Sequence, residues 1–349
     1  MKKKIIVAPL NWGLGHASRC VPIIHLLLKN KYTPIIASDG NALAFLRKEF
    51  PSLDFLKLPA YDIEYAKNLK LSLLLQLPKI WNAVKKEQKL IQKFIDENKD
   101  VVGVISDNRF GVRNENIPSV YITHQMNVLT GFTSFFTSKI HQIIIKKFDE
   151  CWIPDNHKSE FSGKLSIFKH NFNSKFIGVL SRFKKESIPE LIDVLIVLSG
   201  PEPNRTYLEI KLNKEFSNSD KKVILVQGKV EKHQKKTIDK NIITYNYLLS
   251  RELQRLLNMS KIVLCRSGYS SIMDLAVLEK KVFFIPTKNQ TEQEYLATYL
   301  SDKKKAPFCD EDDFTIKKLS EIENYVGLKS EETRLNPALF CLFEGKRKL

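Results

Sequence analysis

The sequence has 349 residues, of which 43% are hydrophobic and 27% charged. This length and composition exclude a disordered, collagen-like or coiled-coil protein and predict about two domains, each able to fold without disulfides or a structural metal. The formal net charge is +17, but only 11 of the 56 basic residues are arginine. Because phosphate and base recognition favour arginine, the charge is weak support for a nucleic-acid-binding protein.

The cysteines and the N-terminus indicate the compartment. Five scattered cysteines without a C-x-x-C pair predict a reducing compartment and no zinc site. The apolar run in MKKKIIVAPL ends at Pro9 and is shorter than the roughly 7–15 residues of a secretory signal, so a buried first strand is the better interpretation. No apolar run approaches the roughly 18 residues of a transmembrane helix. We therefore expect a cytoplasmic protein, either soluble or peripheral at the inner face of the membrane.

Short apolar runs alternate with longer amphipathic segments in the first half of the chain. The runs predict strands at 4–10, 33–38, 101–106, 119–124, 150–155 and 175–180. The segments between them predict helices at 17–30, 41–49, 69–98 with a break near Pro78, and 134–148. This alternation is typical of a parallel sheet with helices on both faces.

The same pattern restarts in the second half. Strands are predicted at 193–200, 222–228, 241–247, 261–268 and 281–287, and helices at 206–216, 248–258, 269–279 and 290–301. The fold class is therefore α/β, with two doubly wound, Rossmann-like domains facing each other across an interdomain cleft. We expect an N-terminal domain over 1–180, a charged linker over 181–192, a C-terminal domain over 193–325 and a helical tail over 326–349.

The first strand ends in a glycine loop, NWGLGHASR (11–19). Gly13 and Gly15 let the backbone turn sharply beside a ligand, and the following helix N-terminus favours anions. Histidine changes protonation near neutral pH, so His16 is a candidate general base, and Arg19 is a candidate phosphate ligand. The alternative is a turn in which His16 only caps the helix. The third glycine of a dinucleotide fingerprint is absent, which argues against NAD.

Two further strand ends add polar residues at the same sheet edge. Asp107 could orient His16 as in a base–orienter pair, or it could be a turn aspartate. Asn108 and Arg109 follow in the same loop as candidate acceptor contacts. His124 is a rival base, an acceptor contact or a structural histidine.

The second half offers a candidate nucleotide site. Ser199 and Gly200 could bind a phosphate, with Arg205 nearby, although an ordinary strand–turn–helix has the same pattern. In CRSGYSSIMDL (265–275) the helix start could bind a phosphate and Asp274 could accept both hydroxyls of a ribose. Two amides and a carboxylate at the next helix start suit a sugar. The candidate residues of these last two segments are Arg266, Ser267, Gly268, Ser270, Ser271, Asp274, Gln290, Glu292 and Gln293.

These motifs resemble glycosyltransferase family 28, the family that includes the enzyme adding N-acetylglucosamine to lipid I and the plant galactolipid synthases. The resemblance covers most of both halves and is clearest in NWGLGHASR and in CRSGYSSIMDL with PTKNQTEQEYLA. It implies the two-domain GT-B fold, with the acceptor on the N-terminal domain and the nucleotide-sugar on the C-terminal one. It also implies that the backbone of Tyr247 and Leu248 contacts the uracil. By the same resemblance, Asp274 occupies the position of the family's ribose-binding glutamate, whose side chain is longer. His16 and Asp107 resemble the histidine–aspartate pair of related plant transferases.

Two other segments carry alternatives. The acidic run DEDD (310–313) contains a D-x-D pattern, but we interpret it as a solvated loop, since family 28 enzymes bind the diphosphate without a metal. The leucine- and lysine-rich stretch 69–89 is either a core helix with a solvated face or a helix lying on an anionic membrane.

The sequence thus predicts an inverting, metal-independent glycosyltransferase that needs no cofactor beyond its UDP-sugar substrate. The acceptor hydroxyl would belong to an unidentified molecule, with a lipid-linked or cell-envelope glycan as one option. A UDP-sugar hydrolase is the alternative, because GLGHASRC resembles the G-x-G-H-x-x-R-C motif of the hydrolase in pseudaminic acid synthesis. A non-catalytic basic protein on membranes or nucleic acid is the remote alternative; nucleic acid is not an expected partner.

Overall fold

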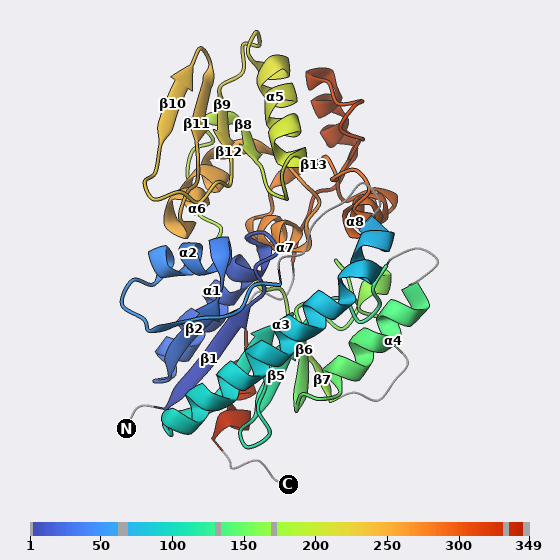
Figure 1. The fold of residues 1–349 in the computed structure, drawn as a ribbon. Helices are drawn as coiled ribbons and strands as arrows, with labels where there is room; N and C mark the ends of the chain where they lie inside the picture. The colour runs from blue at the N-terminus through green and yellow to red at the C-terminus, as the bar shows by residue number, and fades with distance from the viewer. Residues whose placement is uncertain (1–2, 62–68, 130–133, 169–172, 331–334, 345–349) are drawn as a thin grey trace. The chain divides into compact units, whose positions relative to one another are not determined.

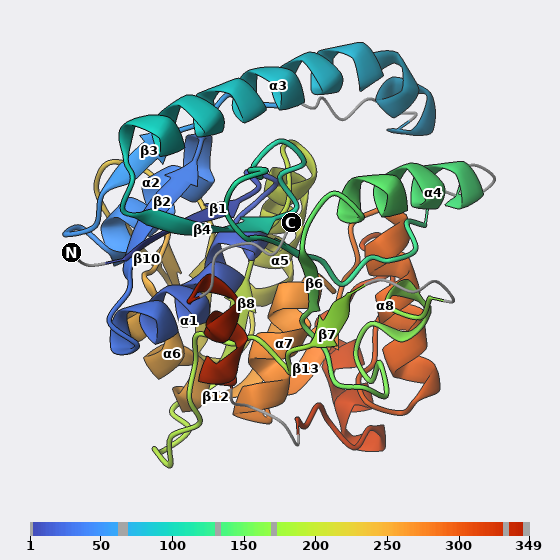
Figure 2. The ribbon, with the colours of Figure 1, turned by 90° about the horizontal axis from the view of Figure 1, so that it is seen from below.

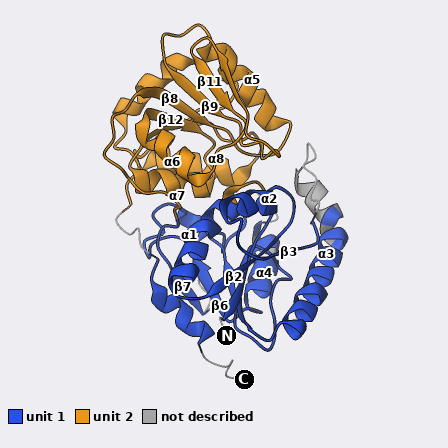
Figure 3. Ribbon diagram, turned by 90° about the vertical axis from the view of Figure 1, so that its left-hand side faces the viewer, with its two compact units in different colours: residues 1–12, 16–180, 334–349 blue, residues 13–15, 181–333 orange. Residues whose placement is uncertain are grey.

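The computed structural model describes residues 3–61, 69–129, 134–168, 173–330 and 335–344. The chain divides into two compact units, which are coloured separately in Figure 3. Residues 1–12, 16–180 and 334–349 form the first unit, and residues 13–15 and 181–333 form the second. The chain therefore passes from one unit to the other between Leu180 and Ser181, and the charged segment 181–192 is part of the second unit.

The first unit contains a seven-stranded sheet with the order β3-β2-β1-β4-β5-β6-β7 (Figure 1). All neighbouring strands are parallel. The strands are β1 Lys4–Pro9, β2 Thr33–Ser38, β3 Phe55–Lys57, β4 Val101–Asp107, β5 Ser119–Ile122, β6 Glu150–Ile153 and β7 Ser174–Phe176. The order reverses between β1 and β4, as in the Rossmann fold, and ligands of such sheets bind at the carboxyl ends of the strands beside this switch point.

Helices cover both faces of this sheet, as Figure 2 shows: α3 and α4 lie on one face, and α1 with the C-terminal 3-10 helix η4 on the other. The helices are α1 Gly15–Lys29, α2 Gly40–Glu49, α3 Leu69–Glu97, α4 Ser134–Ile145 and the 3-10 helices η2 Gly163–Leu165 and η4 Pro337–Phe343. Under α3, Ile91 and Ile95 pack against Ile6 and Ala8 of β1 in a fully apolar cluster. The predicted break near Pro78 is wrong, because α3 is assigned as one helix with Pro78 inside it.

The second unit contains a six-stranded sheet with the order β10-β11-β9-β8-β12-β13. Its strands are parallel except for the antiparallel pair β10–β11. They are β8 Ile192–Val197, β9 Val223–Val226, β10 Lys236–Asp239, β11 Ile242–Tyr245, β12 Ser260–Cys265 and β13 Lys281–Phe284. The switch point of this sheet lies between β8 and β12.

The helices of the second unit are α5 Asn204–Phe216, α6 Ser250–Met259, α7 Tyr269–Leu278, α8 Thr291–Asp302 and the 3-10 helix η3 Ile316–Asn324. Leu208, Leu212 and Phe216 of α5 and Leu319 of η3 pack on alternate residues of β8 in one apolar cluster. The prediction of two Rossmann-like α/β domains is confirmed.

The C-terminal residues return to the first unit. In the described part of the predicted helical tail, the helical segment is η4, whose Leu339, Phe340 and Phe343 are buried. Phe343 packs beside Gly103 of β4, where a Cβ would lie 2.1 Å from its ring. Glycine at position 103 therefore makes room for the returning chain.

Candidate active site

Four polar side chains of the first unit meet at the switch point between β1 and β4. His16 and Arg19 lie in the first two turns of α1, three residues apart and so on one helix face. Asp107 ends β4 opposite Pro9 of β1, and His124 follows the neighbouring strand β5. The sheet topology thus gathers residues from three strand ends that are distant in sequence.

Hydrogen bonds connect these four side chains around the Asp107 carboxylate, which is fully buried. His16 Nδ1 lies 2.7 Å from Asp107 Oδ1. Arg19 donates to both carboxylate oxygens, through Nε to Oδ2 and through Nη2 to Oδ1. Arg19 Nη1 also lies 3.1 Å from His124 Nδ1. Cys20 Sγ is 3.8 Å from Asp107 Oδ2.

The electrostatics of this cluster favour an ionised Asp107. Burial alone would raise the pKa of this carboxyl, but the positive charge and hydrogen bonds of Arg19, together with His16, outweigh burial and lower it to about 2. A carboxylate only accepts hydrogen bonds, so the close contact requires a proton on His16 Nδ1. The lone pair of the neutral ring is then on Nε2, and the side chain of His16 keeps 15% of its surface exposed. The geometry is that of a general base with its orienting carboxylate.

Arg19 is not placed as a phosphate ligand. Its side chain is 1% exposed, and its guanidinium is occupied by Asp107, His16 and His124. The phosphate contact of Arg19 stays a prediction, and in this structure the ion pair with the buried Asp107 takes the donors that a phosphate would need.

Arg109 also lies away from the His16 cluster, in a second buried network. Its guanidinium donates to Glu87, to Asp39 at 2.6 Å and to the Pro59 carbonyl at 2.6 Å. Its predicted acceptor contact is replaced by a structural ion pair that ties α3 to the sheet. Asn108 sits between the two networks with a positive φ of 58°, and its side-chain oxygen accepts from the Tyr121 hydroxyl.

The glycine loop after β1 is open. Gly13 is exposed with a φ of +74°, and nothing lies within 4 Å of the position of a Cβ there. Asn11, which we did not single out from the sequence, anchors the loop: its amide donates to Asp39 and accepts from Ala42 N in α2. Gly15 is the first residue of α1, which therefore begins two residues before the predicted start at 17.

In the second unit, polar groups gather at the switch point between β8 and β12. Ser199 and Gly200 follow β8 and are partly exposed, with Gly200 at a φ of +101°. After β12, Gly268 caps α7 with open space at its Cβ position, and Ser270 and Ser271 lie in the first turn of α7. This places a helix N-terminus, which favours anions, at the carboxyl edge of the sheet.

The two candidate arginines of this unit, Arg205 and Arg266, are held by other protein groups. Arg266 is buried, donates to the Ile285 and Pro286 carbonyls, and pairs with Glu311 at 2.8 Å. Arg205 pairs with Glu202 and donates to the Gln227 carbonyl. Burial lowers the pKa of both. Neither guanidinium is thus placed as a free phosphate ligand.

Asp274 is buried in α7 and holds the segment that enters this unit. Ser181 Oγ donates to Asp274 Oδ1 at 2.6 Å. Burial raises the pKa of Asp274 to about 6, against the opposing influence of Arg182 and Ser181. The ribose contact remains a prediction, because the structure already gives one carboxylate oxygen a protein partner.

The turn from β13 into α8 contains polar atoms that lack partners. Within the described residues, Thr287 Oγ1 and Gln290 Oε1 of this turn are buried without a hydrogen-bond partner, as is Nε of Arg266, which follows β12. Thr287 is 3% exposed, and its Oγ1 would lie 3.7 Å from a Cβ on Gly200. Thr287, which we did not single out from the sequence, thus shares the edge with Ser199 and Gly200.

The remaining predicted sugar and uracil contacts are placed as follows. Gln293 is buried, and its side chain accepts from Thr287 N while its carbonyl accepts from Ser267 Oγ. Glu292 is partly exposed in the first turn of α8. Tyr247 and Leu248 are buried after β11, and Gln234 Nε2 lies 3.2 Å from the Tyr247 carbonyl.

The acidic run 310–313 makes local contacts: Glu311 pairs with Arg266, and Asp312 with Lys288. Over the described residues, no group of three His, Cys, Asp or Glu side chains is arranged to hold a metal ion. Also over these residues, no helix has both the length and the apolar character of a membrane span.

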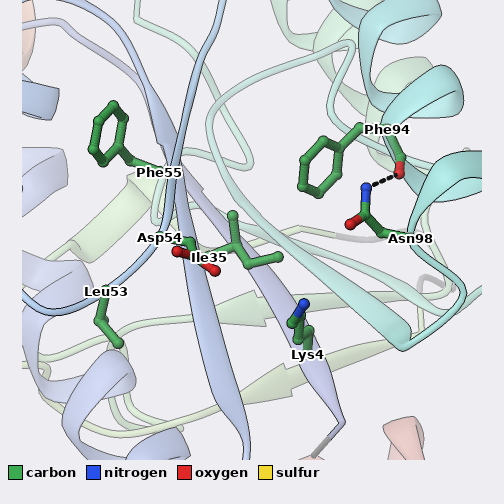
Figure 4. Close-up of a pocket in the computed structure, with 7 residues that line it drawn as sticks. All are labelled: Lys4, Ile35, Leu53, Asp54, Phe55, Phe94 and Asn98. Carbon is green, nitrogen blue, oxygen red and sulfur yellow. Dashed lines mark hydrogen bonds between the residues drawn. The ribbon is translucent and has the colours of Figure 1, made fainter.

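A hollow of about 310 Å³ lies at the opposite edge of the first sheet (Figure 4). It is lined by Lys4, Ile35, Leu53, Asp54, Phe55, Phe94 and Asn98. Lys4 begins β1 and pairs with Asp100 at 2.8 Å. Because this is the amino end of the strands, the hollow is separate from the His16 cluster.

Residues 199–335 match the model of the glycosyltransferase family 28 C-terminal domain. Among curated proteins, the chain is 24% identical over 219 residues to the UDP-N-acetylglucosamine–N-acetylmuramyl-(pentapeptide) pyrophosphoryl-undecaprenol N-acetylglucosamine transferase of Haemophilus ducreyi. This match covers 59% of the chain and 57% of the relative, so the chain spans little more than half of that relative's length.

Solved structures with similar folds include glycosyltransferases. The glycosyltransferase of kitacinnamycin matches with a TM-score of 0.63 and 13% identity, over 98% of this chain and 93% of that one. MurG of Acinetobacter baumannii matches with a TM-score of 0.51 and 12% identity, over 93% and 90%. The comparisons confirm the resemblance to family 28 and the fold, and they support a glycosyltransferase.

Proposed function

We propose that this chain, whose second unit matches glycosyltransferase family 28, is an inverting glycosyltransferase that moves a sugar from a UDP-sugar to an acceptor hydroxyl. The observation that carries the proposal is the His16–Asp107 pair at the switch point of the first sheet, in a chain whose residues 199–335 match the model of the family's C-terminal domain. The first supplies a base for the acceptor, and the second supplies a place for the donor.

The base acts through His16 Nε2. In this mechanism Nε2 takes the proton of the acceptor hydroxyl as its oxygen bonds to the anomeric carbon. The bond from that carbon to the diphosphate oxygen breaks, and its electron pair leaves with UDP. Asp107, 2.7 Å from Nδ1, stabilises the imidazolium that forms. Attack opposite the leaving group inverts the anomeric configuration.

The donor binds at the carboxyl edge of the second sheet. The N-terminus of α7 at Gly268 offers backbone N–H groups to the diphosphate, and Ser270 and Ser271 lie in its first turn. The partnerless Thr287 Oγ1 and Gln290 Oε1 lie at this edge, and leaving such groups unsatisfied costs about 1–3 kcal/mol each. A ligand rich in phosphate oxygens and hydroxyls fits these groups. We propose that no metal or other cofactor takes part, since helix dipoles and N–H groups would neutralise the leaving diphosphate.

The acceptor is proposed to be a lipid-linked or cell-envelope glycan, as in the named activity of the Haemophilus ducreyi relative, reached at the inner face of the membrane. An exposed apolar face on the first unit supports this. Trp81 of α3 and Ile140 and Ile143 of α4 are each at least half exposed, and Lys147 lies 5.9 Å from the Trp81 ring. Of the stretch 69–89, the side chains of 69–75 and 77 lie outside the described residues. Apolar side chains with flanking lysines suit an anionic bilayer surface.

A UDP-sugar hydrolase is the second candidate. Three residues of its motif, His16, Arg19 and Cys20, all contact Asp107 in this structure. These three motif residues thus lie around one carboxylate. A hydrolase that uses the same residues, with water as the acceptor, would require this arrangement.

The deciding experiment measures binding and UDP release for a panel of UDP-sugars, with and without lipid-linked acceptors. The proposal expects one UDP-sugar to bind with micromolar affinity and UDP to appear only with acceptor. Rapid stoichiometric release of UDP and free sugar without acceptor would identify a hydrolase. If no UDP-sugar binds while other nucleotide-sugars do, the uridine assignment is wrong.

A further inference from the structure

A single buried guanidinium contacts three ionisable side chains in the first unit. Arg19 lies in α1 with Asp107 on two of its nitrogens. Its Nη2 is 2.9 Å from His16 Nδ1, and its Nη1 is 3.1 Å from His124 Nδ1. The two imidazoles thus both present Nδ1 to the same group, although one belongs to α1 and the other follows β5.

The chemistry of the guanidinium assigns the proton on His124. Arginine stays charged and can only donate hydrogen bonds. The Nη1 contact therefore requires a lone pair on His124 Nδ1. The neutral ring then carries its proton on Nε2.

The proton on His16 is assigned in the opposite way. Asp107 Oδ1 only accepts, and it is the nearer partner of His16 Nδ1, at 2.7 Å. Arg19 Nη2 also lies 2.9 Å from Nδ1 and can only donate, but a lone pair on Nδ1 would then face the buried Asp107 carboxylate at 2.7 Å. We therefore assign the N–H of Nδ1 to the carboxylate, with one Nη2 proton of Arg19 donated to the same oxygen. His16 is left with its lone pair on Nε2.

We infer that Arg19 is a positioning residue that holds His16 and His124 in opposite tautomers by keeping Asp107 as a hydrogen-bond acceptor and donating to His124. His16 is thereby held in the form that accepts a proton at Nε2. This assignment rests on the proposed function only where it makes His16 the base; the tautomers follow from the contacts alone.

The planar fork of arginine is essential to this arrangement. Nε and Nη2 donate hydrogen bonds to the Asp107 carboxylate, and Nη1 donates one to His124 Nδ1. All three guanidinium nitrogens are therefore used as donors at once. A lysine would keep the charge but replace the fork by one point donor. We therefore expect Arg19→Lys to keep the ion pair with Asp107 and to lose the control of at least one imidazole.

The test is nitrogen NMR of protein labelled with ¹⁵N-histidine, recorded at pH 8. Seven histidines contribute signals, and His16→Gln and His124→Gln assign the two of interest. The inference predicts that wild-type His16 is protonated on Nδ1 and His124 on Nε2. In Arg19→Lys, His124 should become a mixture of tautomers. Arg109→Lys is the matched control, since it alters an equally buried guanidinium of the same unit that pairs with Glu87 and Asp39 instead of with either imidazole.

A wild-type His16 protonated on Nε2, or a His124 protonated on Nδ1, would overturn the inference, even if Arg19→Lys does not fold. Unchanged tautomers in a folded Arg19→Lys would do the same. If the protein turns over a nucleotide-sugar, Arg19→Lys should also lower kcat roughly tenfold or more. The donor Kd should stay within twofold, because the substitution disturbs the general base His16 and leaves the donor-binding residues unchanged. Correct tautomers in a protein that transfers no sugar would refute the proposed function and leave the role of Arg19 intact.

Discussion

Replacing Asp107 by asparagine tests the buried cluster most severely. The substitution keeps the shape of the side chain but turns one acceptor oxygen into an N–H₂ donor. Arg19 Nε, Arg19 Nη2 and His16 Nδ1 all point at this group, so the new amide faces other donors. It also leaves the Arg19 charge buried without its counter-ion.

The pKa of Asp107 gives the magnitude. Lowering it from 3.8 to about 2 means that ionised Asp107 stabilises the folded state by about 2.5 kcal/mol. This stability is fully present above the unfolded pKa and is lost as the pH falls through about 2. At neutral pH, Asp107→Asn should therefore cost about 2–3 kcal/mol, or more if the uncompensated Arg19 adds its own penalty. For a unit of this size, that lowers the Tm by roughly 5–10 °C.

The assay combines thermal unfolding with turnover. Asp155→Asn is the matched control: Asp155 is a fully buried aspartate of the same unit, bonded to Phe161 N and to Ser162. Both variants should lose stability, but below their transition temperatures Asp107→Asn alone should lose roughly 10²–10⁴-fold in kcat. The Tm deficit of Asp107→Asn should be constant between pH 5 and 8, where Asp107 is ionised in both states. An unchanged Tm would refute the buried ion pair, and an unchanged kcat would refute the orienting role.

Burial raises the pKa of Asp274 from 3.8 to about 6, so between these pH values the folded state retains a proton that the unfolded state has lost. The free energy of unfolding should therefore fall by about 3 kcal/mol as the pH rises from about 4 through 6. Asp274→Asn should remove this dependence in urea titrations, whereas an undiminished slope would show that other groups cause it. Thr287→Val should raise the Tm, because it deletes a buried hydroxyl without a partner, and weaken UDP-sugar binding by roughly 2–10-fold in calorimetry; a lower Tm with unchanged affinity would contradict this. Ile143→Glu should abolish flotation with vesicles containing anionic lipid, whereas Ile238→Glu in the second unit should not; equal flotation of both would exclude α4 as the membrane contact.

The sequence predicted the sheets where apolar runs are long. The runs at 4–10 and 33–38 became β1 and β2, because strands buried on both faces need continuous apolar residues. β3 and β10 were missed. β3 has three residues, and all four residues of β10 are exposed, so these edge strands exist through pairing with a neighbour and carry little apolar signal of their own.

The sequence predicted which polar residues lie at strand ends, but not which of these side chains pair with each other. His16 and Asp107 were identified as a pair from their positions after two strands. The sequence could not show that Arg19 belongs to Asp107 while Arg109 belongs to Glu87 and Asp39, because these pairings depend on distances between side chains 22 to 88 positions apart. Thr287 lies at a predicted strand end in the PTKNQTEQEYLA motif, but the sequence could not show that its hydroxyl lacks a partner, since a missing partner is a property of the packed structure.

The most direct test of the account is a comparison of wild type with His16→Gln, using the UDP-sugar that binds and its acceptor. The account predicts that His16→Gln lowers kcat by roughly 10²–10⁴-fold while the donor Kd stays within about twofold, and that the wild-type product has an inverted anomeric carbon. A variant with near-normal kcat, or a product with retained configuration, would contradict it.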